Sequence, residues 1–478
     1  MEKKCIITGI FTMVKTFYYE RTKFISCKGC LLIFSFLLCF ACKEKEPEIK
    51  LLFTGDILLS RNVEVEIERG QKDPWEDLTE LFKSADLVVG NLEGAVGERS
   101  QDDSLSNLIF DIKEKHLPLL PNAGFHVMTI ENNHSSDVAK DGKSKTADAL
   151  LKNNIIPVSY ESSPHFINVK GKVIALVAIN LVKDKYGQRQ EIPSVELKQK
   201  LRFASGTANV TIVCVHWGVE LAEWTVDAQK QAAAWLVKNG ADIIIGHHPH
   251  VIQKPEMVEG KPIFFSLGNH LFDQKYPSTK TGLIADCRIA NGKVEFKGIV
   301  TKTKDKSFYS KIDGEESLNL NPVKLHTQMN LKGYDILPVS TNDGEIILHG
   351  YKSGKKVWAS EPLPVVSLEK VNNVSDTYLF CLQNRYSSLD KEQALRPYVY
   401  DIDDKGLIAK WRGSSLAWPI IDATAIKSDS FKICVLHRGD SYLQLNKNEK
   451  TTRLAKYKWN GFGFSILKSE FCEPCFEH

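Results

Sequence analysis

The stretch "AQKQAAAWLVKNGADIIIGHHPH", Ala228–His250, decides the fold class of this chain. A helical pattern ends at Gly240, and an aliphatic run from Asp242 to Ile245 then leads into three histidines. A helix that passes through a glycine into a buried strand is the repeating unit of α/β proteins. The stretch therefore predicts an α/β domain in which polar side chains follow the carboxyl ends of the strands.

The same arrangement recurs over residues 50–302, which we expect to form one domain with a largely parallel core sheet. In "DPWEDLTELFKSADLVVGNLEG", Asp73 and Pro74 predict the start of a helix that runs to about Lys83, and a buried strand follows at Leu87–Gly90. In "NAGFHVMTIENNH", a strand at His126–Ile130 is expected to lead into a polar loop.

The pattern changes after about residue 303. Short strand-like pieces such as "YDILPVS", "GEIILHGY" and "TYLFCLQNRY" are separated by Gly, Asn, Asp and Ser turns, which predicts an all-β region over residues 303–478. Trp358, Trp411 and Trp459 end related strands and hint at an incomplete propeller, with a β-sandwich as the alternative. We expect this region to contact a glycan, a polymer or a partner protein.

Composition and charge are those of an ordinary globular protein. The 478 residues are 25% charged and 43% hydrophobic, and a chain of this length is expected to form two or three domains. The formal net charge is +3, but without residues 1–41 there remain 56 basic and 57 acidic residues, a net charge of −1. A near-neutral chain lacks the basic surface typical of nucleic-acid binding, so we expect no nucleic-acid partner.

The amino terminus has the pattern of an export signal. A basic stretch up to Lys28 precedes the apolar segment "LLIFSFLLCFA", Leu31–Ala41, which is shorter than the roughly 20 residues that span a bilayer. Ala41-Cys42 resembles a degenerate bacterial lipobox. We therefore expect a signal peptide over residues 1–41, lipidation at Cys42 and a charged linker over residues 42–49, with an ordinary signal peptide or an uncleaved anchor as the alternatives.

Six short polar segments follow apolar strand candidates, in places where the strands of an open α/β sheet end at one crevice. Taken singly, each residue could cap a helix or close a turn, but all six segments supply Asp, Glu, Asn or His. The segments are "TGD" with Asp56, "GNLEG" with Asn91 and Glu93, "ENNHSSD" with Asn133, His134 and Asp137, "VHWGVE" with His216 and Glu220, "GHHPH" with His248 and His250, and "SLGNHLFDQ" with Asn269, His270 and Asp273.

This mixture of carboxylate, amide and imidazole ligands suits Mn, Fe, Zn or Mg better than a thiolate zinc site would. Two such ions can clamp the attacking and leaving oxygens of a hydrolytic displacement. In an extended segment residues i and i+2 point the same way, so we expect His248 and His250 to face one metal. His247 is then expected to point elsewhere, as a bystander or as a residue that orients the site.

Six ordered motifs, "GDILLSR", "GNLEG", "NNHSSD", "HWGVE", "GHHPH" and "SLGNHLFDQ", closely resemble the signature segments of the CapA-type poly-γ-glutamate synthesis (capsule biosynthesis) protein family. That family is similar to calcineurin-like metallophosphoesterases. The resemblance covers residues 50–302 and implies an α/β fold there, a four-layer α/β/β/α sandwich. The predicted all-β C-terminal region lies outside the resemblance.

The resemblance also implies roles for individual residues. His134 looks like the histidine that stabilises the leaving oxygen in phosphoesterases, and Asp137 is a catalytic candidate beside it. Arg61 matches an arginine after the first motif and is expected to hold a substrate carboxylate or phosphate through a bidentate pair. Further candidates for substrate binding are Glu220, Asn269 and Asp273, and the implied metal ligands are Asp56, Glu93, Asn133, His216, His248 and His250.

The chain departs from the phosphoesterase pattern at two places and from the CapA-type pattern at a third. Asp56 is followed by Ile57 and Leu58, whereas the usual first motif is Asp-x-His. The segment Asn91–Glu93 stands where the second motif supplies a bridging aspartate, so the number of metal ions and any phosphoesterase activity stay open. His270 replaces an apolar or aromatic residue after "SLGN" and either adds a ligand or caps the turn.

Two functions of different classes fit these observations. The first is a cell-surface, metal-dependent hydrolase or transferase that acts on an anionic polymer such as poly-γ-glutamate. The second is a polymer-binding or export and assembly factor that keeps the metallophosphoesterase frame without turnover. Both place the protein at the bacterial cell surface or at a periplasm-facing membrane, lipid-anchored beside capsule-synthesis membrane partners.

Overall fold

The computed structural model describes residues 48–70, 73–99, 108–303, 308–374, 376–387, 392–413, 416, 419–438 and 452–467. The expected signal peptide, the lipidation site Cys42 and most of the linker lie outside these residues. Within the described ranges, no helix has both the length and the apolar character that crossing a bilayer requires.

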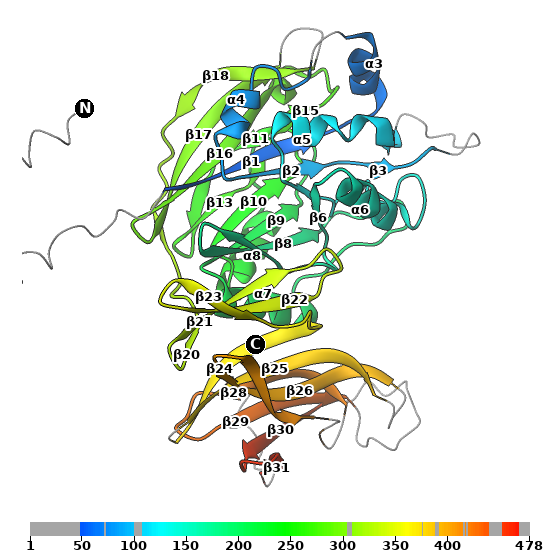
Figure 1. Ribbon diagram of the computed structural model, residues 1–478. Coiled ribbons are helices and arrows are strands. Elements are labelled where there is room, and N and C mark those ends of the chain that lie inside the picture. Colours follow the sequence, from blue (N-terminus) through cyan, green and yellow to red (C-terminus); the bar gives the residue numbers. More distant parts are fainter. Residues whose placement is uncertain are drawn as a thin grey trace, which may run out of the picture. The chain divides into compact units, whose positions relative to one another are not determined.

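A mixed nine-stranded sheet forms one half of the α/β region (Figure 1). Its order is β18-β17-β16-β1-β2-β5-β6, with β15 paired to β1 and β19 paired to β17. Strands β1, β2, β5 and β6 run parallel, and β16 to β18 are antiparallel. The strands span Ile49–Ile57 (β1), Leu87–Leu92 (β2), Val127–Thr129 (β5), Ile156–Val158 (β6), Asn269–Leu271 (β15), Thr281–Ala290 (β16), Lys293–Thr303 (β17), Ser310–Glu316 (β18) and Val323–Lys324 (β19).

A six-stranded sheet of order β12-β13-β10-β9-β8-β7 forms the other half. Its inner strands β8, β9, β10 and β13 are parallel, and the edge strands β7 and β12 are antiparallel to their neighbours. They span His165–Val169 (β7), Lys172–Asn180 (β8), Val210–His216 (β9), Ile243–His247 (β10), Glu256–Val258 (β12) and Lys261–Phe264 (β13). Two small pairs join Ile252–Gln253 (β11) to Ser266–Leu267 (β14), and Ala95–Val96 (β3) to Asp111–Ile112 (β4).

The two sheets pack face to face because their strands are apolar on both sides. Ile174 and Leu176 of β8 share one buried core with Leu51 and Phe53 of β1. Ala175, which lies between the first two in sequence, belongs instead to a core on the outer face, as the alternation of side chains along a strand requires. Such continuous aliphatic runs are typical of parallel strands that are covered on both faces.

Helices cover the outer faces of both sheets. Leu52 and Val88 of the nine-stranded sheet pack with apolar side chains of four helices: Arg61–Arg69 (α3), Thr79–Lys83 (α4), Leu119–Ala123 (α5) and Gly142–Lys152 (α6). The outer face of the six-stranded sheet packs with Val195–Thr207 (α7) and Asp227–Lys238 (α8). The predicted mixed α/β fold is confirmed.

Two glycines permit a close backbone approach next to the polar strand ends. A Cβ atom on Gly246 in β10 would lie 2.0 Å from the carbonyl oxygen of Phe265. One on Gly55 in β1 would lie 1.9 Å from the carbonyl oxygen of Gly268. Only glycine fits at these positions, so the chain around residues 265–268 can pass directly against the ends of β1 and β10.

The helix predicted from Asp73 to Lys83 forms only in its second half, as α4. Before it, successive turns carry hydrogen bonds from Glu76 N to Asp73 O and from Leu78 N to Trp75 O. The Asp73 carboxylate accepts a hydrogen bond from the Trp75 backbone at 2.8 Å, and the Trp75 ring is buried in the helix-side core. An aspartate that closes a local turn competes with helix formation, which explains the later start.

The C-terminal region is all-β, as predicted. Its first two strands, β18 and β19, pair with β17 in the nine-stranded sheet. The described strands after them form two antiparallel sheets, one of four strands (β20 to β23) and one of eight (β24 to β31). Their bounds are Asn330–Leu331 (β20), Tyr334–Ser340 (β21), Ile346–Lys352 (β22), Lys355–Ala359 (β23), Val365–Asn373 (β24), Asp376–Ser387 (β25), Glu392–Asp403 (β26), Gly406–Arg412 (β27), Ile420–Ile426 (β28), Lys432–Arg438 (β29), Thr452–Trp459 (β30) and Phe464–Ile466 (β31).

The three tryptophans do not mark repeated propeller blades. Trp358 lies in the four-stranded sheet, whereas Trp411 and Trp459 both belong to the eight-stranded sheet. The rings of Trp411 and Trp459 pack edge to face, with centroids 6.4 Å apart. These two side chains therefore share one core instead of repeating an equivalent position in successive blades.

A continuous apolar core joins α7 to the C-terminal sheets. Leu201 of α7 belongs to the same buried cluster as Leu368 of β24. Beside it, Arg202 donates hydrogen bonds to both carboxylate oxygens of the buried Asp422, at 3.0 and 2.7 Å, and Gln199 donates to Asp422 at 2.9 Å. Removal of the C-terminal sheets would therefore expose the apolar side of α7 and leave Arg202 without this carboxylate.

The domain boundary after residue 302 stays a prediction that truncation can test. We expect a fragment of residues 48–325 to fold with lower stability than the whole chain, because α7 loses its apolar cover. A fragment of residues 48–302 should be less stable again, since it lacks β18 and β19, which pair with β17. Urea denaturation followed by tryptophan fluorescence measures both. If neither fragment unfolds cooperatively, the chain is one cooperative unit and the two-domain division is wrong.

Candidate functional site

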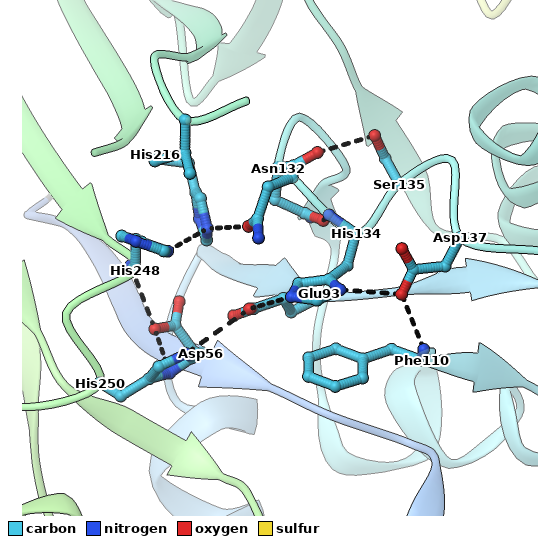
Figure 2. Close-up of polar contacts among 12 residues, drawn as sticks. Asp56, Glu93, Phe110, Asn132, His134, Ser135, Asp137, His216, His248 and His250 are labelled. Atoms are coloured by element: carbon cyan, nitrogen blue, oxygen red, sulfur yellow. Dashed lines mark hydrogen bonds and ion pairs between the residues drawn. The ribbon is translucent and has the colours of Figure 1, made fainter. Parts of the chain in front are cut away.

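Parallel strands of both sheets end at one group of polar side chains. The register places Asp56 at the end of β1 opposite Asn91 of β2, and His216 at the end of β9 opposite His247 of β10. The backbone N–H of His248 donates to Asp56 at 3.3 Å, which joins the two sheets. We call this group the carboxylate–histidine cluster: Asp56, Glu93, Asn133, His134, His216, His247, His248 and His250 (Figure 2).

Asp56 is the best-connected member of the cluster. It is fully buried, its Oδ1 accepts a hydrogen bond from Asn91 Nδ2 at 2.8 Å, and His247 Nδ1 lies 3.1 Å from the same oxygen. His250 Nδ1 lies 3.2 Å from Oδ2. Burial alone would raise the pKa of Asp56, but the contacts with His247 and His250 hold it well below its usual range. Asp56 is therefore a carboxylate at neutral pH.

The Glu93 carboxylate is buried and has no hydrogen bond to the described part of the chain. Neither of its carboxylate oxygens has a hydrogen-bond partner among the described residues, and its exposed fraction is 0%. Its Oε1 lies 3.6 Å from His250 Nε2 and 3.9 Å from His134 Nε2, too far for hydrogen bonds. Burial, with the negative charge of Asp56 nearby, raises the pKa of Glu93 well above its usual value.

Two side chains contact the His216 ring. Its Nε2 lies 2.8 Å from Asn133 Oδ1 and 3.1 Å from His248 Nδ1. Figure 2 shows the contact between His216 and His248. Burial, followed by the neighbouring His248, lowers the pKa of His216, and burial lowers the pKa of His248 to about 3. Both rings are therefore neutral at pH 7, the state in which imidazole binds metals.

His250 behaves differently because it faces the carboxylates. Burial opposes its charged form, but Glu93 and Asp56 raise the pKa of His250 to about 9. The raised pKa values of Glu93 and His250 favour the protonated form of each group. These protons compensate negative charge that a bound divalent cation would otherwise compensate. Metal binding at such a site releases protons, so acid should weaken it.

His248 and His250 do not lie in an extended segment. Their φ angles are +96° and +61°, in the left-handed region that non-glycine residues rarely adopt. The expectation that His247 points elsewhere is also wrong, because its ring contacts Asp56. Pro249 and the hydrogen bond from Leu221 N to Pro249 O hold a tight turn here, so the alternation rule for strands does not apply. Backbone strain of this kind tends to occur at functional sites.

His134 is held by Asp137 and Phe110. Its Nδ1 lies 2.8 Å from Asp137 Oδ2, which also accepts the backbone N–H of Phe110 at 2.8 Å. The Phe110 ring stacks on the His134 ring with centroids 3.8 Å apart. The Asp137 contact leaves Nε2 directed toward Glu93, as Figure 2 shows. A carboxylate–histidine pair in this arrangement fixes which ring nitrogen faces the reaction.

The candidates for substrate binding have partners within the protein. Arg61 and Asp273 form a salt bridge in which Arg61 Nε donates to Asp273 Oδ2 at 3.1 Å. Asn269 Oδ1 lies 2.9 Å from His250 Nδ1, so this amide orients a histidine of the cluster. Glu220 is exposed, and its charge acts on both Glu93 and His250.

His270 is turned away from the cluster. Its Nε2 accepts a hydrogen bond from Trp75 Nε1 at 3.0 Å, and its ring packs against Phe82 and Phe125. Asn269 and His270 are neighbours in β15 and point to opposite faces, so only Asn269 reaches the site. The sequence left two roles open for His270, an added ligand or a cap of the turn. The structure shows neither, because His270 is a hydrogen-bonded histidine of the core.

Three residues of the site were not selected from the sequence. Asn132 donates to the Leu92 carbonyl at 2.9 Å and accepts the His134 backbone N–H at 3.1 Å, so it fixes the loop on which His134 lies. His247 was not chosen as a ligand, because the alternation of side chains along a strand placed it away from His248 and His250. Phe110 carries no polar signal, and only its place in the fold shows that it supports His134.

The residues present fit a divalent cation. The ligand atoms of Asp56, Glu93 and His216 all lie within 4.8 Å of one another. Both Glu93 oxygens and His216 Nδ1 are buried polar atoms without hydrogen-bond partners in the described part of the chain. Unpaired buried carboxylates are costly, and oxygen and imidazole ligands together suit Mn, Fe or Zn.

Comparisons with known proteins agree with this geometry. Residues 50–274 match the family described as "Bacterial capsule synthesis protein PGA_cap". The chain is 29% identical over 274 residues to the PGA biosynthesis protein CapA of Bacillus subtilis (strain 168), which covers 52% of this chain and 72% of the relative. It is also 29% identical over 260 residues to the capsule biosynthesis protein CapA of Bacillus anthracis, covering 50% of this chain and 63% of that relative.

A more distant relative is a probable polyglutamine synthesis accessory protein of Mycobacterium tuberculosis (strain CDC 1551 / Oshkosh), 23% identical over 226 residues, covering 42% of this chain and 60% of that one. An α/β fold with buried carboxylates and histidines at its strand ends is compatible with a metallophosphoesterase-like protein. Over residues 50–274 the chain is similar to the CapA-type capsule synthesis protein family.

The burial of His270 predicts a pH dependence of stability. Burial lowers the pKa of His270 to about 3, whereas in the unfolded chain it is about 6.5. Below pH 6.5 the unfolded chain takes up a proton that the folded protein excludes, so stability falls as the pH falls toward 3. In His270→Gln, which keeps an acceptor for Trp75, the loss of unfolding free energy between pH 8 and pH 5 should be smaller by about 2 kcal/mol. Urea denaturation at both pH values measures it, and an unchanged loss would show that the folded protein protonates His270.

Proposed function

We propose that this protein is a cell-surface capsule or poly-γ-glutamate biosynthesis protein that acts as a metal-dependent hydrolase or transferase on an anionic polymer. Two Bacillus relatives carry the names PGA biosynthesis protein CapA and capsule biosynthesis protein CapA, which supports the polymer class. We assign the two stacked sheets and their helices to the four-layer α/β/β/α sandwich of the metallophosphoesterases.

The observation that carries the proposal is the burial of Glu93 beside Asp56. Two carboxyl groups without exposure to water, one of them lacking any hydrogen bond among the described residues, require compensation by protons or by a cation. Arginine and lysine do not supply it, because the ion-pair partners of Asp56 and Glu93 in the described chain are histidines. A bound divalent ion meets this requirement and accounts for the neutral rings of His216 and His248.

The proposed ligands of the ion or ions are Asp56, Glu93, Asn133, His216, His248 and His250. A divalent ion, when bound, stabilises developing negative charge on oxygen and lowers the pKa of water. His247 contacts Asp56 Oδ1 and Asn91 donates to the same oxygen, so both orient this carboxylate. Asn269 does the same for His250.

His134 is the proposed general acid. Asp137 accepts a hydrogen bond from Nδ1 and leaves Nε2 to carry the proton that passes to the leaving group. The Phe110 ring covers one face of the imidazole and limits its hydration. In this proposal Arg61 and Asp273 act as a pair at the edge of the site, with the Arg61 guanidinium 4.7 Å above the Phe110 ring.

A non-catalytic polymer-binding or assembly factor is the second candidate, and one observation favours it. Leu58 occupies the position of the histidine in the phosphoesterase Asp-x-His motif, and it is fully buried against Phe110 and Phe272. The first motif therefore supplies one ligand instead of two. A site with fewer ligands than a phosphoesterase can retain a metal and bind polymer without turnover.

Export and lipid anchoring at Cys42 complete the proposal. The apolar segment Leu31–Ala41 and the following cysteine support a lipid-anchored protein at the cell surface or a periplasm-facing membrane, beside capsule-synthesis membrane partners. The mass of the mature N-terminal peptide tests this, because lipidated Cys42 adds acyl mass and an unmodified peptide excludes the anchor.

Metal content tests the site directly. The purified chain should contain Mn, Fe or Zn, and His248→Ala/His250→Ala should lose it because two ligands are removed. His349→Ala is the matched control, since this partly exposed histidine of β22 lies outside the cluster. Elemental analysis gives the metal-to-protein ratio. Retention of the full ratio in the double variant would contradict the ligand assignment.

Turnover separates the two candidate functions. With metal present, the protein should shorten poly-γ-glutamate or transfer its chain ends, and His134→Gln should lower the rate by about 10²–10⁴-fold because it removes the proton donor. Release of new amino termini and the polymer length in gel filtration measure this. A metal-loaded protein that binds the polymer and leaves its length and ends unchanged would favour the assembly factor.

A further inference from the structure

A second group of potential ligands lies on α3, outside the carboxylate–histidine cluster. Glu64 and Glu68 are four residues apart in α3, so their carboxylates lie on the same face of the helix. His116 ends the short 3₁₀ helix η2 (Glu114–His116) and faces them. The ligand atoms of these three side chains lie within 4.8 Å of one another.

The state of His116 indicates that a cation belongs in this group. Its side chain is 7% exposed, and Nε2 has no hydrogen-bond partner among the described residues. Nε2 lies 3.8 Å from Glu64 Oε1 and 3.6 Å from Glu68 Oε1, beyond the range of a hydrogen bond. Burial also lowers the pKa of His116, which favours the neutral ring. A buried imidazole nitrogen that lacks a hydrogen-bond partner and is directed at two carboxylates offers a third ligand atom for a cation.

The spacing of the three donor atoms fits one zinc ion. Two ligands that are each 2.0–2.2 Å from a tetrahedral ion are about 3.3–3.6 Å apart. The distances from His116 Nε2 to the two glutamate oxygens are 3.6 and 3.8 Å, close to this range, and all three ligand atoms lie within 4.8 Å of one another. We propose that Glu64, Glu68 and His116 bind a divalent cation of the zinc class, with water as the remaining ligand.

Two lysines approach the same carboxylates. Lys113 forms an ion pair with Glu64, and Lys115 Nζ lies 2.5 Å from Glu68 Oε1. Their side chains are 46% and 59% exposed, so both can turn into solvent at small cost. These ammonium groups compete with the cation for the glutamates, and neither reaches His116 Nε2 with a hydrogen bond.

The bound cation would join α3 to the segment that supports His134. α3 begins at Arg61, whose guanidinium lies over the Phe110 ring, and Phe110 stacks on His134. The same chain continues from Phe110 through β4 to His116. The ion is therefore a structural link, separate from the proposed catalytic centre, and it does not depend on the proposed function.

Zinc stoichiometry of the full chain tests the proposal, with Zn²⁺ alone as the probe. After equilibration with Zn²⁺ and removal of free ion by gel filtration, Glu64→Gln/Glu68→Gln and His116→Gln should each contain one Zn²⁺ per chain less than the unchanged protein. Glu66→Gln is the matched control, because this glutamate of α3 pairs with Arg69 and not with His116. An unchanged stoichiometry in both ligand variants would overturn the proposal.

The lysines separate a metal site from a salt-bridge cluster. Lys113→Gln/Lys115→Gln removes the competing charges, so it should bind the α3 zinc more tightly in calorimetry and gain thermal stability when Zn²⁺ is added. No Zn²⁺-dependent gain in this variant would overturn the proposal even if the glutamate variants do not fold. Asp56→Asn/His250→Ala should keep the α3 zinc, so failure of the proposed catalytic centre is distinguishable from failure of this site.

Discussion

The structure depends on one electrostatic constraint, the placement of Asp56 and Glu93 where water cannot reach them. Asp56 lies in the parallel strand β1 and Glu93 follows the parallel strand β2. The second sheet brings histidines of β9, of β10 and of the turn after β10 against them. An isolated buried carboxylate would be strongly unfavourable, so its neighbours must supply protons, hydrogen bonds or a cation. Burial keeps His216 and His248 neutral, whereas Glu93 and Asp56 outweigh burial at His250 and favour its charged form.

Sheet architecture was predictable from sequence because apolar alternation and strand ends are local signals. The parallel strands β2, β5 and β10 were expected within a few residues of where they lie, and the C-terminal strand β21 has the bounds of the quoted "YDILPVS". The helix at Asp73 was predicted too long, because an aspartate-closed turn and the burial of Trp75 are decided by tertiary packing. The tryptophan spacing suggested propeller blades, but the spacing of residues along the chain does not reveal which sheet each strand joins.

The candidate site was predictable as a set of residues and less so as a geometry. Polar residues after strands identify which side chains meet, since the carboxyl ends of parallel strands share an edge. Their orientation depends on the turn at His248–His250, whose positive φ angles have no signature in the letters GHHPH. Phe110 acts by stacking on His134, a contact between segments distant in sequence. Asn132 acts through loop hydrogen bonds, which require a backbone conformation that residue type alone does not determine.

The apolar contact between α7 and the C-terminal sheets has a consequence for biosynthesis. The side of α7 that packs with Leu368 and Leu379 has no cover until the chain beyond β24 and β25 has been made. A nascent chain that has completed both sheets of the α/β region still presents this surface to chaperones and to other copies of itself. The late C-terminal strands thus close the molecule, and this surface of α7 is covered only after they have been synthesised.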